Sequence, residues 1–246
     1  MNGELNEDAI QTALPPDFSA ELHILQQTAS TNEDAKALAK SGAPHGSVVF
    51  ACSQTNGRGR LGRTFLSPGG GIYFSMILRT APADAIYITT AAAVAVCRAI
   101  ESVSPARPQI KWVNDIYQNG RKVCGILAEA TPEGAVILGI GINYTGAPAE
   151  IPEAGPLFEK DFAPDKNRFA ATLISELLRV FAEMSGGNLL DEYRKRSCVL
   201  GKTIRYLENN LWRTAQALDI DETGGLVVSS DGETKILRSG EITLRV

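Results

Sequence analysis

The chain has 246 residues, of which 44% are hydrophobic and 21% charged, enough to build one large domain with a small appendage. Its formal net charge of −4 argues against broad nucleic-acid binding, which needs a basic face that displaces counterions. No uncharged run reaches the roughly 18 residues of a membrane-spanning helix, and the acidic N-terminal residues are unlike a signal peptide. We therefore expect a cytoplasmic protein with no DNA partner and no membrane partner.

The chain has few residues that could hold a metal. Four cysteines stand at positions 52, 97, 124 and 198 without a Cys-x-x-Cys pair, and the only histidines are His23 and His45. Three of the cysteines lie in apolar runs, which is typical of buried free thiols. The sequence predicts no metal site built from protein side chains.

The predicted elements indicate an α+β fold. Residues 1–20 are polar, contain Pro15-Pro16 and are expected to form a loose leader. Periodicity and turn residues then predict strands at 22–25, 47–53, 72–78, 109–113, 121–130 and 135–143, and helices at 31–40, 84–103, 167–184 and 189–198.

After Gly201 the pattern changes to short strands at 203–207, 215–220, 226–229, 235–237 and 242–246, separated by polar turns. Short strands in close succession favour a small β-barrel. We therefore expect a leader at 1–20, a main domain at 21–199 and a small β domain at 200–246.

The chemistry is expected in a loop rich in glycine and arginine. No acidic residue lies between Asp34 and Asp84, and the centre of this segment is Gly57–Arg63. Its basic residues are Lys36, Lys40, Arg58, Arg60, Arg63 and Arg79. Glycines let backbone N–H groups approach an anion, and guanidinium forks pair with phosphate or carboxylate oxygens. The segment therefore predicts a polyanion site.

Two other interpretations of this loop are a solvated surface segment and a phosphate-binding P-loop. A P-loop requires lysine where Arg63 stands and a helix directly afterwards, whereas Ser67-Pro68 and three glycines follow. A second Gly-Lys-Thr sequence, at 201–203, lacks the first glycine of the motif. Both fail as P-loops.

Three further clusters of residues could belong to a binding site, but each has a purely structural interpretation when it is considered alone. Lys111–Asp115 is a strand end with an Asn-Asp turn, whose lysine could point into a cleft. Ser30 and Glu33 have the spacing of a helix capping box. Gly139–Asn143 is a strand that ends in glycines and an asparagine.

Together the clusters resemble the biotin protein ligases over Gln26 to Val246. The segments that carry the resemblance are Ser30–Asn32, Gln54–Arg63, Ser67-Pro68, Lys111–Asp115, Lys122–Glu129, Gly139–Asn143 and Gly240–Arg245. The resemblance implies a central mixed sheet with helices on one side, similar to class II aminoacyl-tRNA synthetases, and a C-terminal SH3-like β-barrel. Val113 stands where many members have proline, which we interpret as a conservative change at a strand position.

The resemblance also implies site residues. Around biotin it places Ser30, Thr31, Asn32, Gln54, Gly57, Arg58, Lys111, Lys122 and Gly125. Around ATP it places Arg58, Arg60, Arg63, Phe65, Asn114 and Asn143. The catalytic roles fall to Lys111, Arg60 and Arg63, and Arg238 or Arg245 could reach the ATP phosphates from the C-terminal barrel.

The implied activity has two steps. Biotin and ATP give biotinyl-5′-AMP, with Mg²⁺ on the phosphates, and biotin then passes to a lysine of a biotin carboxyl carrier protein, such as that of acetyl-CoA carboxylase. A lipoate–protein ligase and a non-catalytic biotin or nucleotide sensor are the alternatives. A homodimer through an edge strand is left open.

Larger members of the family carry an N-terminal helix-turn-helix that makes them repressors. Only 29 residues precede Ser30, and they are acidic and interrupted by prolines. We therefore expect a ligase without repressor activity. A gel-shift measurement at physiological salt should show no selective binding to an operator, and selective binding would overturn this expectation.

Overall fold

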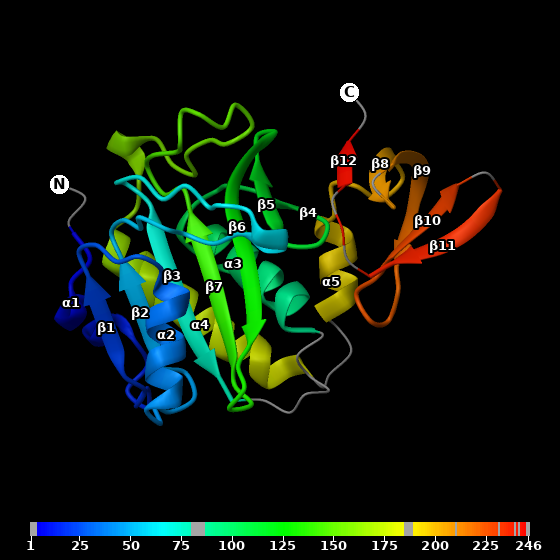
Figure 1. The fold of residues 1–246 in the computed structure, drawn as a ribbon. Coiled ribbons are helices and arrows are strands. Elements are labelled where there is room, and N and C mark those ends of the chain that lie inside the picture. The colour runs from blue at the N-terminus through cyan, green and yellow to red at the C-terminus, as the bar shows by residue number, and fades with distance from the viewer. Residues whose placement is uncertain are drawn as a thin grey trace.

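The computed structural model describes residues 4–79, 87–184, 189–209, 211–230, 232–238, 240 and 242–244. Its main feature is a seven-stranded mixed sheet in the order β1-β2-β3-β7-β6-β5-β4 (Figure 1). Strands β1 and β2 are parallel, and all other neighbouring pairs are antiparallel. The strands are β1 (Leu22–Leu25), β2 (Val48–Ala51), β3 (Ile72–Leu78), β4 (Gln109–Lys111), β5 (Asp115–Gln118), β6 (Arg121–Ala130) and β7 (Val136–Ile142).

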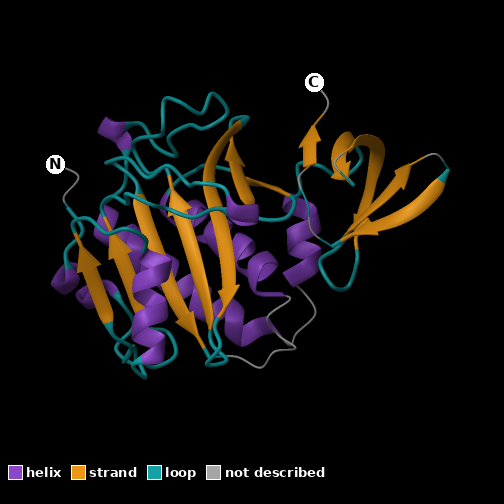
Figure 2. Ribbon diagram, in the orientation of Figure 1, coloured by secondary structure: helices purple, strands orange, loops and turns teal. Residues whose placement is uncertain are grey.

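Helices cover both faces of this sheet (Figure 2). They are α1 (Glu7–Ala13), α2 (Thr31–Lys40), α3 (Ile88–Val103), α4 (Lys166–Glu183) and α5 (Leu189–Arg196). Alternate side chains of a strand point to opposite faces. Phe50 and Phe74 therefore join the large core that contains α3 and α4, with ring centroids 5.1 Å apart. Val49, Ile77 and Ile137 pack instead with the alanines of α2. The expectation of helices on one side was wrong, because strands buried on both faces need two covers.

The N-terminal segment is also more ordered than the sequence predicted. The side chain of Asn6 caps α1 by accepting a hydrogen bond from the Ala9 N–H at 2.9 Å, and the Asn6 N–H donates to Asn167 of α4 at 2.7 Å. Ile10 and Leu14, one helical turn apart, are buried in the main core. The prediction of a loose leader was wrong, because a helix of two turns with so few apolar residues gives a weak periodic signal next to Pro15-Pro16.

The turn between β4 and β5 was likewise mispredicted. Strand β4 ends at Lys111, and β5 begins at Asp115, where the sequence predicts a turn. Val113 therefore lies in a hairpin turn and not in a strand, and the Trp112–Val113 peptide bond is cis. The apolar run through Val113 conceals the end of β4. The predicted helix start at Asp84 lies outside the described residues, and the other elements are present with ends that differ by a few residues.

A second, antiparallel sheet contains the C-terminal strands in the order β11-β10-β9-β8-β12 (Figure 1). Its strands are β8 (Thr203–Glu208), β9 (Leu211–Ile220), β10 (Leu226–Ser230), β11 (Glu233–Leu237) and β12 (Ile242–Leu244). This sheet agrees with the predicted small C-terminal β domain, while its exact boundary at residue 200 stays a prediction. None of the described helices combines the length and apolarity that crossing a bilayer requires.

Ile10 tests whether α1 is part of the folded core. Its side chain is fully buried, so Ile10→Ala should lower the free energy of unfolding by about 2–5 kcal/mol through lost burial and a residual cavity. Gln11→Ala, on the exposed face of the same helix, is the matched control. Urea denaturation of both variants measures the difference, and an unchanged midpoint for Ile10→Ala would show that α1 does not contribute to stability.

Candidate functional site

A cavity of about 190 Å³ lies over the open face of β3, β7 and β6. The Gly/Arg loop, the turn between β4 and β5, the start of α2 and the strand β12 enclose it. The predicted site residues that line it are Ser30, Thr31, Asn32, Gln54, Arg58, Arg60, Arg63, Phe65, Lys111, Asn114, Lys122 and Gly125. Gly57 and Asn143 do not line it. Segments far apart in the sequence are thus brought together as the motifs predicted.

One end of the cavity, near α2, carries a network of neutral polar side chains. The Thr31 N–H and hydroxyl both donate to the Gln54 carbonyl oxygen, at 2.9 and 3.1 Å, and the Gln54 amide donates to the Ser67 hydroxyl at 2.8 Å. The Ser75 hydroxyl lies 2.8 Å from Thr31 Oγ1 and 2.6 Å from Asn32 Oδ1. This network fixes the first turn of α2 and the orientation of each amide. It suits a neutral polar group of a ligand.

The capping box predicted at the start of α2 is absent. The Ser30 side chain makes no capping hydrogen bond, and Glu33 instead forms ion pairs with Lys36 at 2.9 Å and with Arg58 at 3.1 Å. Lys36 also pairs with Glu129 at 3.0 Å. Burial raises the pKa of Glu129, but hydrogen bonds from Asn32 and Lys36 outweigh it, so that its pKa lies below the ordinary value. The hydroxyl of Ser30, buried at the cavity wall, is left for another partner.

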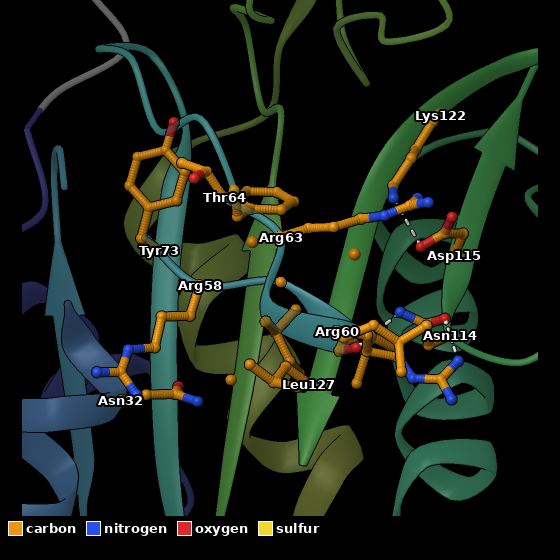
Figure 3. Close-up of a pocket in the computed structure, with 18 of the residues that line it drawn as sticks. Asn32, Arg58, Arg60, Arg63, Thr64, Tyr73, Asn114, Asp115, Lys122 and Leu127 are labelled. Atoms are coloured by element: carbon orange, nitrogen blue, oxygen red, sulfur yellow. Dashed lines mark hydrogen bonds and ion pairs between the residues drawn. The ribbon is translucent and has the colours of Figure 1, made fainter. Parts of the chain in front are cut away.

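The Gly/Arg loop turns tightly so that its arginines diverge. Leu61 has a positive φ of 56°, and the Gly59 N–H donates to the Arg63 carbonyl at 2.7 Å. Arg60 points inward, and its Nη1 donates to the Asn114 side-chain oxygen at 3.1 Å (Figure 3). Burial lowers the pKa of Arg60 from its usual high value, yet the group stays cationic. Arg60 is therefore a fixed positive charge inside the cavity.

Gly57 is required for the fold of the Gly/Arg loop and does not line the cavity. A side-chain carbon at this position would lie 2.4 Å from the Phe65 carbonyl oxygen and 2.7 Å from Ser67 Oγ. Because backbone cannot yield to such contacts, only glycine lets the two sides of the loop pair. Its predicted role beside biotin stays a prediction.

Lys111 stands at the end of β4 with its ammonium group held by an aromatic neighbour. Its Nζ donates to the Tyr117 hydroxyl at 3.3 Å and lies 5.3 Å from the centre of the same ring. Burial raises the pKa of Tyr117, which therefore stays neutral. Tyr117 is not among the residues that the sequence predicts for the site. Alternation along β5 places Asp115 and Tyr117 on one face, but that signal required knowing that β5 is a strand.

The remaining turn residues are each tied to a different element. Asn114 Nδ2 donates to the Ile126 carbonyl at 2.9 Å, and the buried Tyr193 hydroxyl donates to the Val113 carbonyl at 3.0 Å. The Trp112 indole N–H donates to the carbonyl of Gly224 in the C-terminal β domain at 2.9 Å. The turn beside Lys111 is therefore held from three sides.

The cavity also contains acidic groups. Asp115 forms an ion pair with Lys122 at 2.8 Å, and Arg63 extends toward both of them (Figure 3). Glu153 lies at the rim of the cavity. Within the described ranges, no group of three or more His, Cys, Asp or Glu side chains could hold a metal on its own. The four cysteines are free; Cys97, Cys124 and Cys198 are buried, whereas Cys52 is half-buried.

The floor of the cavity is an aromatic ring that lies on bare backbone. A side-chain carbon at Gly125 would lie 3.0 Å from the Phe65 ring, and one at Gly141 would lie 2.3 Å from it. The edge of Tyr73 packs against the same ring, with centroids 6.4 Å apart. Both glycines are therefore needed for Phe65 to lie flat on the sheet.

Asn143 directly follows strand β7, just outside the cavity. Its N–H donates to the Val123 carbonyl at 2.8 Å, and its side-chain amide donates to the Lys122 carbonyl at 3.3 Å. Its side-chain oxygen is buried without a hydrogen-bond partner among the described residues. An unpaired buried acceptor is costly, so a ligand donor at this point would be stabilising.

The arrangement suits two negatively charged groups that must approach each other. Fixed cations stand at its centre, a neutral polar network lies at the end near α2, and an aromatic ring forms the floor. Among the described residues that line the cavity, no side chain is placed as a nucleophile beside a general base. Charge stabilisation and positioning are therefore the chemistry that this geometry can supply.

Comparison with known proteins agrees with this geometry. The family model for the biotin/lipoate A/B protein ligase family matches residues 24–143. The biotin–[acetyl-CoA-carboxylase] ligase of Mycobacterium tuberculosis is 36% identical, over 90% of this chain and 88% of that protein. The bifunctional ligase/repressor BirA of Bacillus subtilis is 33% identical, over 98% of this chain and 80% of that protein.

Solved structures show the same fold. The biotin protein ligase of Aquifex aeolicus, in complex with biotin and ATP, superposes with a TM-score of 0.80 at 28% identity, over 92% of this chain and 98% of that one. The Leishmania major enzyme, in complex with biotinyl-5-AMP, gives a TM-score of 0.66 at 25% identity, over 91% of this chain and 99% of that one. The chain therefore belongs to the biotin/lipoate A/B protein ligase family and, within it, to the biotin protein ligases.

Proposed function

We propose that this chain uses ATP to convert biotin into biotinyl-5′-AMP and then transfers the biotinyl group to a lysine of a carboxyl carrier protein. The observation that carries the proposal is the convergence of Arg60 and Lys111 in one cavity with a neutral polar network beside them. Relatives named as biotin–[acetyl-CoA-carboxylase] ligases, and neighbours in complex with biotin, ATP or biotinyl-5-AMP, support it.

The two ends of the cavity suggest how the substrates lie. The ureido group of biotin is polar and uncharged, which matches the network of Thr31 and Gln54 at the α2 end. Its carboxylate would then extend toward Lys111. The nucleotide takes the opposite side, where the C-terminal β domain contributes to the wall.

The first step joins two anions. A biotin carboxylate oxygen attacks the α-phosphorus of ATP, an O–P bond forms, and the bond to the bridging oxygen breaks to release pyrophosphate. Lys111 would bridge the carboxylate and the α-phosphate, while Arg60 and Arg63 stabilise charge on the phosphate oxygens. These groups lower the barrier by cancelling repulsion in a cavity where the effective dielectric constant is low.

A magnesium ion fits this site only together with the nucleotide. Mg²⁺ usually takes one or two carboxylates, substrate phosphates and several waters. Asp115 and Glu153 are the carboxylates that line the cavity, and Asp115 already pairs with Lys122. When bound, the ion would neutralise charge on the leaving pyrophosphate.

In the second step a neutral lysine amine of the carrier attacks the carbonyl carbon of the mixed anhydride. A C–N bond forms, the C–O bond breaks, AMP leaves with the electron pair, and the amine loses a proton. The intermediate hydrolyses readily in water, so the loop at 57–70 must shield it. Its position over the cavity is consistent with that role.

A pyrophosphate-exchange assay tests the proposal against its alternatives. With biotin and Mg-ATP, labelled pyrophosphate should enter ATP, and with lipoate it should not. Exchange that depends on lipoate would indicate a lipoate–protein ligase. No exchange with either acid, and no AMP release with a carrier domain present, would indicate a non-catalytic sensor and overturn the proposal.

Lys111→Gln should reduce biotin-dependent exchange at least about 100-fold, because a neutral amide cannot balance the charge that develops between carboxylate and phosphate. Lys195→Gln, at an exposed position on α5, is the matched control and should keep the activity of the wild-type protein. Exchange rates at saturating biotin and ATP measure the effect. Equal activity of the two variants would remove Lys111 from the mechanism.

Arg60→Gly should loosen retention of the adenylate, because it removes the fixed cation that Asn114 orients. Released adenylate acylates any accessible lysine, so this variant should label bystander proteins that the wild-type protein leaves unlabelled. Arg107→Gly, in an exposed loop, serves as the control. Mass spectrometry of a mixture of carrier and albumin gives the measurement, and labelling of the carrier alone by Arg60→Gly would rule out the retention role.

A further inference from the structure

The tryptophan next to Lys111 connects the cavity to the C-terminal β domain. Trp112 is only 4% exposed, and its indole N–H donates to the Gly224 carbonyl at 2.9 Å. This bond joins the hairpin turn of the main sheet to the turn between β9 and β10. A hydrogen bond in a buried interface is costly to lose, since its acceptor is then left without a partner.

The turn that accepts this bond is rigid. The side chain of Asp221 accepts hydrogen bonds from the Thr223 N–H at 2.9 Å, the Thr223 hydroxyl at 2.7 Å and the Gly225 N–H at 2.8 Å. Its other oxygen pairs with Arg238 at 2.9 Å. This ion pair helps to hold the turn. The approach of Arg238 to the ATP phosphates stays a prediction, and Arg245 lies outside the described residues.

Two helices of the main domain hold the same turn. Gly224 has a φ of +80°, and a side-chain carbon there would lie 3.1 Å from Cγ2 of Thr90 in α3. Arg194 of α5 donates to the Ile220 carbonyl at 2.9 and 2.6 Å and pairs with Asp219 at 3.1 Å. Of the residues that contact the turn between β9 and β10, Trp112 is the one next in sequence to Lys111, the predicted catalytic lysine.

The position of the C-terminal β domain shapes the cavity. Gly240, Ile242 and Thr243 line it together with Lys111 and Trp112. Strand β12, which contains Ile242 and Thr243, pairs with β8 of the same small sheet, so that a shift of this domain would move that wall. The wall lies on the side assigned to the nucleotide, since the neutral network occupies the α2 end.

We propose that Trp112 is a positioning residue for the nucleotide: its hydrogen bond to Gly224 holds the C-terminal β domain against the ATP side of the cavity. This inference rests on the proposed function. It predicts that weakening the bond impairs ATP binding, while biotin binding at the α2 end is preserved.

Trp112→Phe tests the bond by keeping an aromatic ring and removing the N–H donor. In biotin-dependent exchange, KM for ATP should rise about five- to tenfold, the effect of one lost buried hydrogen bond, while KM for biotin and kcat stay within about twofold. The chain has two tryptophans, so Trp212→Phe on the exposed surface of the C-terminal sheet is the matched control and should change nothing. Equal changes in the parameters for ATP and biotin, or no change, would overturn the inference.

Gly224→Ala approaches the same bond from the C-terminal side, at a residue that does not itself line the cavity. Its added carbon is strained at this φ and crowds Thr90, so the turn must shift. KM for ATP should rise by a similar factor, and the double variant with Trp112→Phe should be no worse than either single variant. Independent, multiplicative effects would show that Trp112 acts by touching the nucleotide and not through Gly224.

Fluorescence gives a readout that does not depend on activity. In the Trp212→Phe background Trp112 is the only tryptophan, and adding Gly224→Ala should shift its emission to longer wavelength as the indole gains water. An unshifted spectrum would contradict the proposed docking contact. If the wild-type protein shows no biotin-dependent exchange, the proposed function fails; if it exchanges normally and these variants match it, only this inference fails.

Discussion

The constraint on which the site depends is that its central cations must stay available for a ligand. Arg60 is oriented by the amide of Asn114 and Lys111 by the phenol of Tyr117, and both partners are neutral. Among the described residues, neither cation has a carboxylate within ion-pair distance, whereas Arg58 pairs with Glu33 at the edge. A neutral partner fixes the position of a cation without cancelling its charge. The two groups are therefore organised before any substrate arrives, so little reorganisation is required during reaction.

Glycines make room for these groups by removing side chains from the sheet. A carbon at Gly139 would lie 2.3 Å from Asn32, and one at Gly141 would lie 2.3 Å from the Phe65 ring. The alternation of glycines along β7 thus lets a polar side chain and an aromatic ring lie on the same face. Over Gly139 and Gly141 the strand therefore carries the side chains of other segments in place of its own. The glycines of this motif are explained by packing on the sheet as much as by approach to a ligand.

The sequence predicted the site better than the local structure around it. The Gly/Arg loop and the lysine motif each carry several chemically constrained residues, so the predicted site residues, apart from Gly57 and Asn143, line the cavity. Helix α1 and strand β5 were missed, because each is short and its apolar pattern is masked by prolines or by an Asn-Asp pair. The capping box at Ser30 was wrong because Glu33 instead pairs with Lys36, three residues further along α2, and with Arg58 of the Gly/Arg loop. Tertiary electrostatics of this kind is not visible in a local motif.

The segment Lys111–Asp115 shows why these residues occur together. Lys111 contacts a tyrosine of β5, and Trp112 contacts the C-terminal β domain. Val113 accepts a hydrogen bond from a tyrosine of α5. Asn114 contacts both the Gly/Arg loop and β6, and Asp115 pairs with a lysine of β6. Five consecutive residues thus reach five different parts of the fold. A displacement of any of these parts is transmitted to the turn that directly follows the predicted catalytic lysine. Because these contacts share one short backbone segment, they couple the Gly/Arg loop, the sheet and the C-terminal β domain where the cavity forms, and the geometry for joining two anions depends on that coupling.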